Sequence, residues 1–170
     1  MALKLLRFIA LIALFGGPGP AAAYDPLPGD TVIMLDRGWC EGEGAGCPVY
    51  RVLIFADGDV VWQGHSGVVK RGFALGQIER DQIRALIQGF EAIDYFHLEN
   101  IYNFKGSGCQ SNAAFNPTIV TLIATHGASK TLTHHKGCDS DVARKLSDLE
   151  DSIDKAANTG PWVKGKRQAK

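Results

Sequence analysis

The order of apolar and polar residues predicts strands and helices in separate parts of the chain. Short apolar runs rich in Val, Ile, Leu and Phe, without helical spacing, are typical of strands. In the first half of the chain such runs predict strands over 31–35, 49–56, 59–63 and 68–75. The last of these contains Gly72, where we expect the strand to be broken. Two further runs, 118–126 and 130–135, predict strands nearer the C-terminus.

Turn residues join these runs into two hairpins. Asp57-Gly58 follows the run 49–56, and Asp-Gly between two apolar runs is a strong hairpin signal. Gly127-Ala128 separates the two later runs, and Gly suits the first position of a two-residue turn. A turn at that place would set His126 opposite Ser129.

Helical spacing occurs in two segments. Over 79–92, apolar residues recur at i, i+3, i+4 and i+7, which predicts a helix with one buried stripe. This stripe consists of Ile83, Leu86, Ile87 and Phe90. A second helix is expected to start after a cap at Asp139 or Ser140 and to end at Asn158. Its stripe consists of Val142, Leu146, Leu149 and Ile153.

The order of these elements indicates an α+β domain. We expect an antiparallel sheet of about five to six strands, made of two hairpins and flanking strands, with two helices packed on one face. After the first helix, Tyr95, Phe96 and Leu98 are expected to lead the chain back to the core, and 100–117 to be irregular. The whole arrangement fits a single domain over residues 24–163, and the basic segment 164–170 is expected to be disordered.

The first 23 residues have the features of an export signal. Lys4 and Arg7 precede an apolar stretch over 8–15, and Ala21-Ala22-Ala23 offers a small-residue cleavage site. The alternative is a retained anchor, but the stretch is far shorter than the roughly 20 residues that span a bilayer. We therefore expect an exported protein, periplasmic or extracellular, with no transmembrane segment after signal removal.

The net charge of the chain bears on whether nucleic acid is a partner. Removing the two basic residues of the signal leaves 16 basic against 18 acidic residues, a net charge of −2 with neutral histidines. A protein that binds nucleic acid in bulk normally carries a basic face, so nucleic acid is not expected as a partner.

Four cysteines, Cys40, Cys47, Cys109 and Cys138, remain after the signal. An even number in an exported protein favours disulfides, and three pairings are possible. We prefer Cys40–Cys47 and Cys109–Cys138, because each pair closes a local segment. A redox role for Cys40 and Cys47 is the alternative, but redox pairs are usually closer together and lie at a helix N-terminus.

Other candidate metal-binding and catalytic residues do not match the spacing of known motifs. His134, His135 and Cys138 could bind zinc with Cys109 or His126, but neighbouring residues of a regular strand point to opposite faces. The acidic residues Asp36, Glu41, Glu43 and Asp57 could act as an acid–base group or bind calcium, although their spacing matches no EF-hand loop. Ser66 and Ser107 lie between glycines in sequences typical of turns and lack the G-x-S-x-G pattern.

The tryptophans allow two interpretations. Trp39 adjoins Cys40, Trp62 lies on a predicted strand, and Trp162 is near the C-terminus. Aromatic side chains on one sheet face could form a binding platform, but packing in the core near the disulfide is the expected role of at least one of them.

One combination of motifs resembles a known family. The chain contains Cys40, the sequence Cys47-Pro48-Val49-Tyr50, the Asp57-Gly58 turn and Gly64 in the same order as in exported bacterial proteins known as domain of unknown function 6438. Further matching positions are Gly72, Leu86, Tyr95-Phe96 and Tyr102. The resemblance covers about residues 31–153. It implies the fold and export, and it implies no activity.

Two functions are therefore considered. The first is a non-enzymatic binding or interaction module with an unknown envelope or extracellular partner, no cofactor and no bound metal. Its expected contact loop contains Glu41, Glu43, Asp57 and Gly58. The alternative is a hydrolase or metal-dependent enzyme that uses His134 or His135 with loop carboxylates. The sequence leaves the oligomeric state open.

Overall fold

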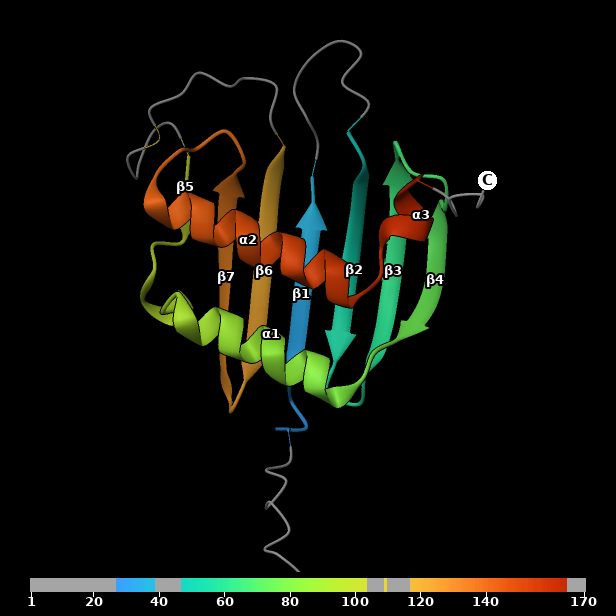
Figure 1. Ribbon diagram of the computed structural model, residues 1–170, viewed down its shortest axis with the longest axis horizontal. Helices are drawn as coiled ribbons and strands as arrows, with labels where there is room; N and C mark the ends of the chain where they lie inside the picture. Colours follow the sequence, from blue (N-terminus) through green and yellow to red (C-terminus); the bar gives the residue numbers. More distant parts are fainter. Residues whose placement is uncertain (1–26, 39–46, 104–108, 110–116, 165–170) are drawn as a thin grey trace, which may run out of the picture.

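The computed structural model describes residues 27–38, 47–103, 109 and 117–164, and consists of one mixed sheet with helices on one face (Figure 1). The strands are β1 (Val32–Arg37), β2 (Val49–Phe55), β3 (Asp59–Ser66), β4 (Gly72–Gln77), β5 (Ile101–Tyr102), β6 (Thr118–Thr125) and β7 (Ala128–His135). Their order across the sheet is β4-β3-β2-β1-β6-β7-β5. All neighbours are antiparallel except β5 and β7, which are parallel.

The predicted fold class is confirmed, with two differences in the sheet. It has seven strands where five to six were expected, because β5 lies within a stretch expected to be irregular. Gly72 begins β4 and does not break it: its φ of +71° reverses the chain before the strand starts.

The two hairpin turns differ in detail from those predicted. The first loop has three residues, Ala56 to Gly58, and Gly58 at φ +96° takes the left-handed position. In the second, Thr125 pairs with Ala128, so the turn is His126-Gly127, one residue earlier than expected. Both turn residues have positive φ, which matches the twist of the strands.

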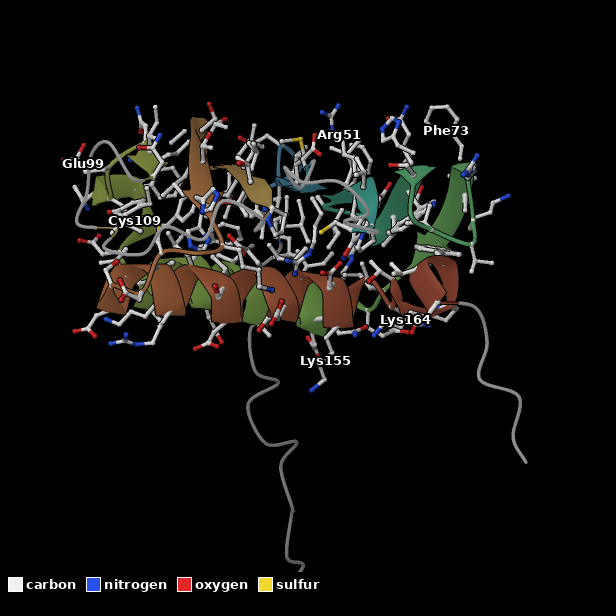
Figure 2. All side chains as sticks on the ribbon, turned by 90° about the horizontal axis from the view of Figure 1, so that it is seen from above. Arg51, Phe73, Glu99, Cys109, Lys155 and Lys164 are labelled. Carbon is white, nitrogen blue, oxygen red and sulfur yellow. A yellow bond between two sulfur atoms is a disulfide. The ribbon has the colours of Figure 1, made fainter. Side chains whose placement is uncertain are left out.

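Strand side chains divide strictly between two faces. The inner residues of β1 and β2, such as Ile33, Leu35, Val52 and Ile54, are fully buried under the helices. The intervening residues point to the other face. Figure 2 shows the described helices as a single layer below the sheet, with none of them on the second face.

The helices begin and end largely where the pattern places them. Helix α1 (Arg80–Ala92) is capped by Glu79, whose backbone N–H donates to Gln82 Oε1 at 3.0 Å in a reciprocal capping box. Its four predicted stripe residues are all buried. Helix α2 (Asp141–Ala156) is capped by Ser140, which accepts from the Ala143 N–H at 3.2 Å.

Two short helices complete the layer. The 3₁₀ helix η1 (Tyr95–His97) buries Tyr95 fully but leaves Phe96 38% exposed, so only part of the expected aromatic group reaches the core. Helix α3 (Gly160–Lys164), absent from the sequence-based prediction, holds the β3–β4 connection, since Lys70 donates to Trp162 O at 2.9 Å. No helix in the described residues is long and apolar enough to cross a membrane. The expected signal, 1–23, and residues 165–170 of the expected tail lie outside the described residues.

Replacing Phe90 by alanine should lower the free energy of unfolding by about 3–5 kcal/mol, because this side chain is 1% exposed and makes an edge contact with Tyr95 at 4.8 Å. The matched variant Phe96→Ala should lose less than about 1 kcal/mol, because Phe96 is largely outside the core. Urea unfolding of both variants measures the difference, and equal losses would contradict this placement of the core.

Candidate functional site

The sheet face away from the helices carries a continuous row of apolar side chains. Strand register places its members side by side across five strands: Leu75, Val61, Leu53, Met34 and Leu122. At the usual spacing of strands, this row is about 19 Å long. We call the surface formed by this row, with Phe73 and Phe55 beside it, the open face.

Exposure is greatest at the β4 end of the open face. The side chains of Leu75 and Phe73 are 79% and 67% exposed. In Figure 2, Phe73 and Arg51 project from the side opposite to Lys155 and Lys164 of the helix layer. Large apolar side chains grouped on one surface mark interaction sites more often than isolated ones do.

The open face has a hollow beside the β2–β3 loop. A pocket of about 540 Å³ is lined there by apolar residues that include Val32, Phe55, Val61 and Leu75. Asp57, Asp59 and Arg80 also line it. An apolar pocket with a few polar groups at its border is the usual form of a binding site.

An ion pair lies on the open face. Arg51 on β2 donates from Nε to Asp36 Oδ2 on β1 at 2.9 Å, and its Nη2 also contacts this carboxylate. The guanidinium is 44% exposed, so the ion pair adds little to stability. It places Asp36, one of the candidate acids, in a surface ion pair.

The residues of the expected contact loop do not share one place. Asp57 and Gly58 lie in the β2–β3 loop, beyond the C-terminal end of β2, whereas Cys47 precedes its N-terminal end. Glu41, Glu43 and Cys40 lie outside the described residues. Of the expected contact residues, Asp57 therefore adjoins the open face through the pocket that it lines.

A polar cluster joins α2 to the other end of the sheet. The Arg37 side chain on β1, 9% exposed, donates from Nε to Asp154 Oδ2 and from Nη2 to Asp151 Oδ1, both at 2.7 Å. The Tyr50 hydroxyl donates to Asp154 Oδ1 at 2.7 Å, and the Thr159 hydroxyl donates to the same oxygen at 3.0 Å. Asp154 is thus the common acceptor of three side chains.

This environment changes two pKa values. Burial is the largest single influence on Arg37 and opposes its charge, but Asp154, Tyr50 and Asp151 together outweigh it, so the pKa of Arg37 is raised above its ordinary value. Burial, reinforced by the negative charge of Asp154, raises the pKa of Tyr50. Arg37 therefore remains a cation and Tyr50 a neutral donor at physiological pH.

A second pocket of about 660 Å³ borders this cluster. Its lining includes Arg37, Tyr50, Pro48, Lys136 and Thr159. Lys136 Nζ lies 3.5 Å from Asp151 Oδ1, so Asp151 of α2 forms an ion pair with this lysine as well as with Arg37. Arg37 and Lys136 are thus both paired with acids of α2, which favours a structural role for them, and Lys164 also lines the pocket.

The two adjacent histidines have different surroundings. His134 is fully buried, and its Nδ1 lies 2.8 Å from Glu150 Oε1 on α2. His135 is half-buried on the other face, and its Nδ1 accepts from the Gly137 N–H at 3.2 Å. His134 therefore lies in the core, and His135 lies on the opposite face of β7. The described residues contain no group of side chains arranged to hold a metal.

The His134–Glu150 pair was missed by the sequence analysis. Both side chains are completely inaccessible, and His134 Nε2 and Glu150 Oε2 have no partner within the described residues. A signal existed in the sequence: Glu150 follows the stripe residues Leu146 and Leu149 on the same side of α2. A charged residue within an apolar stripe indicates a buried polar partner.

The cysteines and tryptophans have structural surroundings. Cys109 and Cys138 are joined by a disulfide, which links the segment after β5 to the β7–α2 turn. Cys47 is disulfide-bonded as well. Trp62 is fully buried, stacked on Tyr50 at 4.5 Å and 5.3 Å from Trp162, and is therefore part of the core. Trp39 and Ser107 lie outside the described residues, and Ser66 ends β3.

Removing the charge of Asp154 should destabilise the fold strongly. Asp154→Asn leaves Arg37 buried with only the exposed Asp151 as an anionic partner, and we expect a loss of about 3–5 kcal/mol. Asp151→Asn should cost less than about 1 kcal/mol, because Asp151 is 63% exposed. Chemical unfolding compares the two, and a larger effect at Asp151 would refute this assignment.

Alkaline pH should destabilise the fold through two tyrosines. Burial raises the pKa of both Tyr50 and Tyr95 above the ordinary value of 10.0, so the folded state keeps protons that the unfolded state releases. This contribution is fully present below pH 10 and is lost above it, by about 1.4 kcal/mol for each tyrosine at pH 11.

The measurement is the stability difference between pH 9 and pH 11, for the parent and for Tyr50→Phe and Tyr95→Phe. Each substitution should reduce the pH dependence by about half of the tyrosine contribution. An unchanged pH dependence in both variants would show that neither hydroxyl is held in its protonated form.

Comparison with known proteins identifies the family but no activity. No curated protein matches the chain. Residues 31–157 match the family described as Domain of unknown function (DUF6438), as the motif at Cys47-Pro48-Val49-Tyr50 suggested. Since this match covers most of the chain, the protein belongs to the DUF6438 family.

Proposed function

We propose that this chain is an exported, non-enzymatic binding module of the cell envelope, and that the open face is its contact surface. The observation that carries this proposal is the apolar row across five strands, over which no helix of the described residues lies (Figure 2). Antiparallel sheets that meet water on one face normally carry alternating polar residues there. Leu53, Met34 and Leu122 depart from that pattern at the centre of the sheet.

The chemistry of the open face favours a protein partner with apolar side chains. The row is long and flat, and its charged neighbours Arg51 and Asp36 neutralise each other. A partner that inserts an apolar side chain into the pocket beside Leu75 would meet Asp57, Asp59 and Arg80 at its border. This arrangement suits an apolar anchor flanked by charged or polar residues.

Export is supported by sequence features and by the disulfide. The apolar N-terminal stretch ends in small residues, and disulfides persist in oxidising compartments. The enzymatic alternative has less support, because His134 is enclosed in the core and His135 points to the other face. The two histidines therefore do not serve one reaction centre.

A lysine at the centre of the open face should abolish partner binding without unfolding the domain. We expect Leu53→Lys and Leu122→Lys to weaken binding at least tenfold, because each places a charge in the apolar contact. Gln88→Lys, at an exposed position of α1 in the helix layer, is the matched control and should bind as the parent does. Circular dichroism and thermal unfolding verify the fold of each variant.

The partner is first captured from envelope extract and identified, and the purified pair is then measured by calorimetry. Mass spectrometry of the parent isolated from the envelope should show an N-terminus at Tyr24. Equal affinity of the parent and both lysine variants would exclude the open face, and an intact N-terminal segment in a cytosolic protein would exclude export.

A further inference from the structure

The two edges of the sheet are protected to very different degrees. At one edge, β5 contains only two residues, and short edge strands resist pairing with other chains. At the other edge, β4 has six residues and contains no charged residue and no proline. Neither of these usual protections of an edge strand is present in β4.

The outward-pointing backbone groups of β4 follow from its register with β3. The Ile78 N–H donates to Gly58 O at 2.9 Å, and Asp59 lies opposite Gln77. Because hydrogen-bonded pairs alternate in antiparallel ladders, Gly76 and Ala74 also point their backbone groups toward β3. The N–H and C=O groups of the intervening residues point outward. These are Phe73, Leu75 and Gln77.

The helix layer covers β4 on one face and leaves this edge free. Trp162 Cη2 lies 3.0 Å from the position that a Cβ would take on Gly76, so α3 packs on the inner face of the strand. Among the described residues, no backbone hydrogen bond reaches Phe73, Leu75 or Gln77 from the outer side. The edge therefore presents three donors and three acceptors to a further strand.

We propose that β4 pairs antiparallel with β4 of a second copy of this chain, forming one continuous sheet across a two-fold axis. The proposal uses the backbone of the edge and does not depend on the partner of the open face. In the dimer both helix layers lie on one side and both open faces on the other. A single partner surface could then contact two open faces at once.

The opposite charges of Arg71 and Glu79 favour one register of the paired strands. Lys70 and Arg71 precede β4, and Glu79 follows it. With Leu75 opposite Leu75 of the second copy, Phe73 lies opposite Gln77 and Arg71 lies opposite Glu79. Opposite charges thus meet at both ends of the paired strands, and one position further out the same register sets Lys70 opposite Arg80.

The size of the contact predicts a weak dimer. This register joins the strands by about six backbone hydrogen bonds, and the paired edges bury less than the roughly 1,200 Å² of a typical stable complex. We therefore expect a dissociation constant on the order of tens of micromolar. Dimerisation at this strength depends strongly on local concentration.

Sedimentation equilibrium of the full chain, purified with its disulfides, tests the stoichiometry from about 1 to 500 µM. A monomer–dimer equilibrium is expected. Amide exchange measured by NMR at both ends of this range tests the edge residue by residue. The amides of Phe73, Leu75 and Gln77 should exchange fast when dilute and slowly when concentrated, while those of Ala74 and Gly76 stay protected throughout.

Two proline variants separate the outer edge from the inner ladder. Leu75→Pro removes an outward N–H and spares the β3 ladder, so it should weaken dimerisation at least tenfold and leave a folded monomer. Gly76→Pro removes an inward N–H and should instead lower thermal stability. Leu75→Ala, which keeps the outward N–H, should dimerise more tightly than Leu75→Pro.

Three outcomes would overturn the proposal. The first is a parent protein that remains monomeric at the highest concentration. The second is a dimer that Leu75→Pro does not weaken but Leu122→Lys does, which would place the contact on the open face. The third is exchange at Phe73, Leu75 and Gln77 that does not change with concentration, which decides the matter even if Leu75→Pro fails to fold.

Discussion

Packing of α2 across the inner face of the sheet is the interaction on which the rest of the fold depends. Its apolar stripe covers the sheet, and two acids extend from it to strands on either side of β6. Asp154 accepts from Arg37 and Tyr50, and Glu150 meets His134. Both contacts are largely enclosed, where removing one member of a charged pair is costly. These polar contacts fix where α2 lies along and across the strands, which apolar packing alone would specify less tightly.

The long periodic elements could be predicted from the sequence, because their apolar residues repeat over several turns or several strand positions. Both main helices were found in this way, with the whole stripe of α1 and most of that of α2, where Val142 is only partly buried. The inward direction of the Arg37 side chain could also be predicted, since Arg37 continues the alternation of Ile33 and Leu35 on β1. The partners of Arg37 could not be predicted, because Asp151 and Asp154 lie more than a hundred residues away in the sequence and only the folded chain brings them near.

Short elements could not be predicted, because they lack a repeat. Two residues of β5 and five of α3 are too few to show any period. The second turn was predicted one residue too late. His126 adopts φ +53°, a conformation that glycine adopts more easily, so the prediction took Gly127 as the first residue of the turn. The open face was also missed: apolar residues on both sides of a strand look like a fully buried strand, and only the helix layer shows which face is covered.

The residues that identify the family have structural roles in this molecule. Tyr50 donates to Asp154 and stacks on Trp62. Gly64 lies so close to the β3–β4 connection that a Cβ would come within 2.0 Å of Lys70 O. The family pattern thus records how the sheet is built and how α2 is attached to it. Family membership therefore carries information about the fold of this chain.

The disulfide between Cys109 and Cys138 makes one edge of the sheet sensitive to the redox state of its surroundings. It closes a loop of 29 residues that contains β6 and β7, and such a closure disfavours the unfolded chain. Next to it, β5 has only two residues of ladder with which to hold its place. In a reducing compartment the segment after β5 would lose this covalent attachment. The integrity of this edge is then a property of the compartment as much as of the amino-acid sequence.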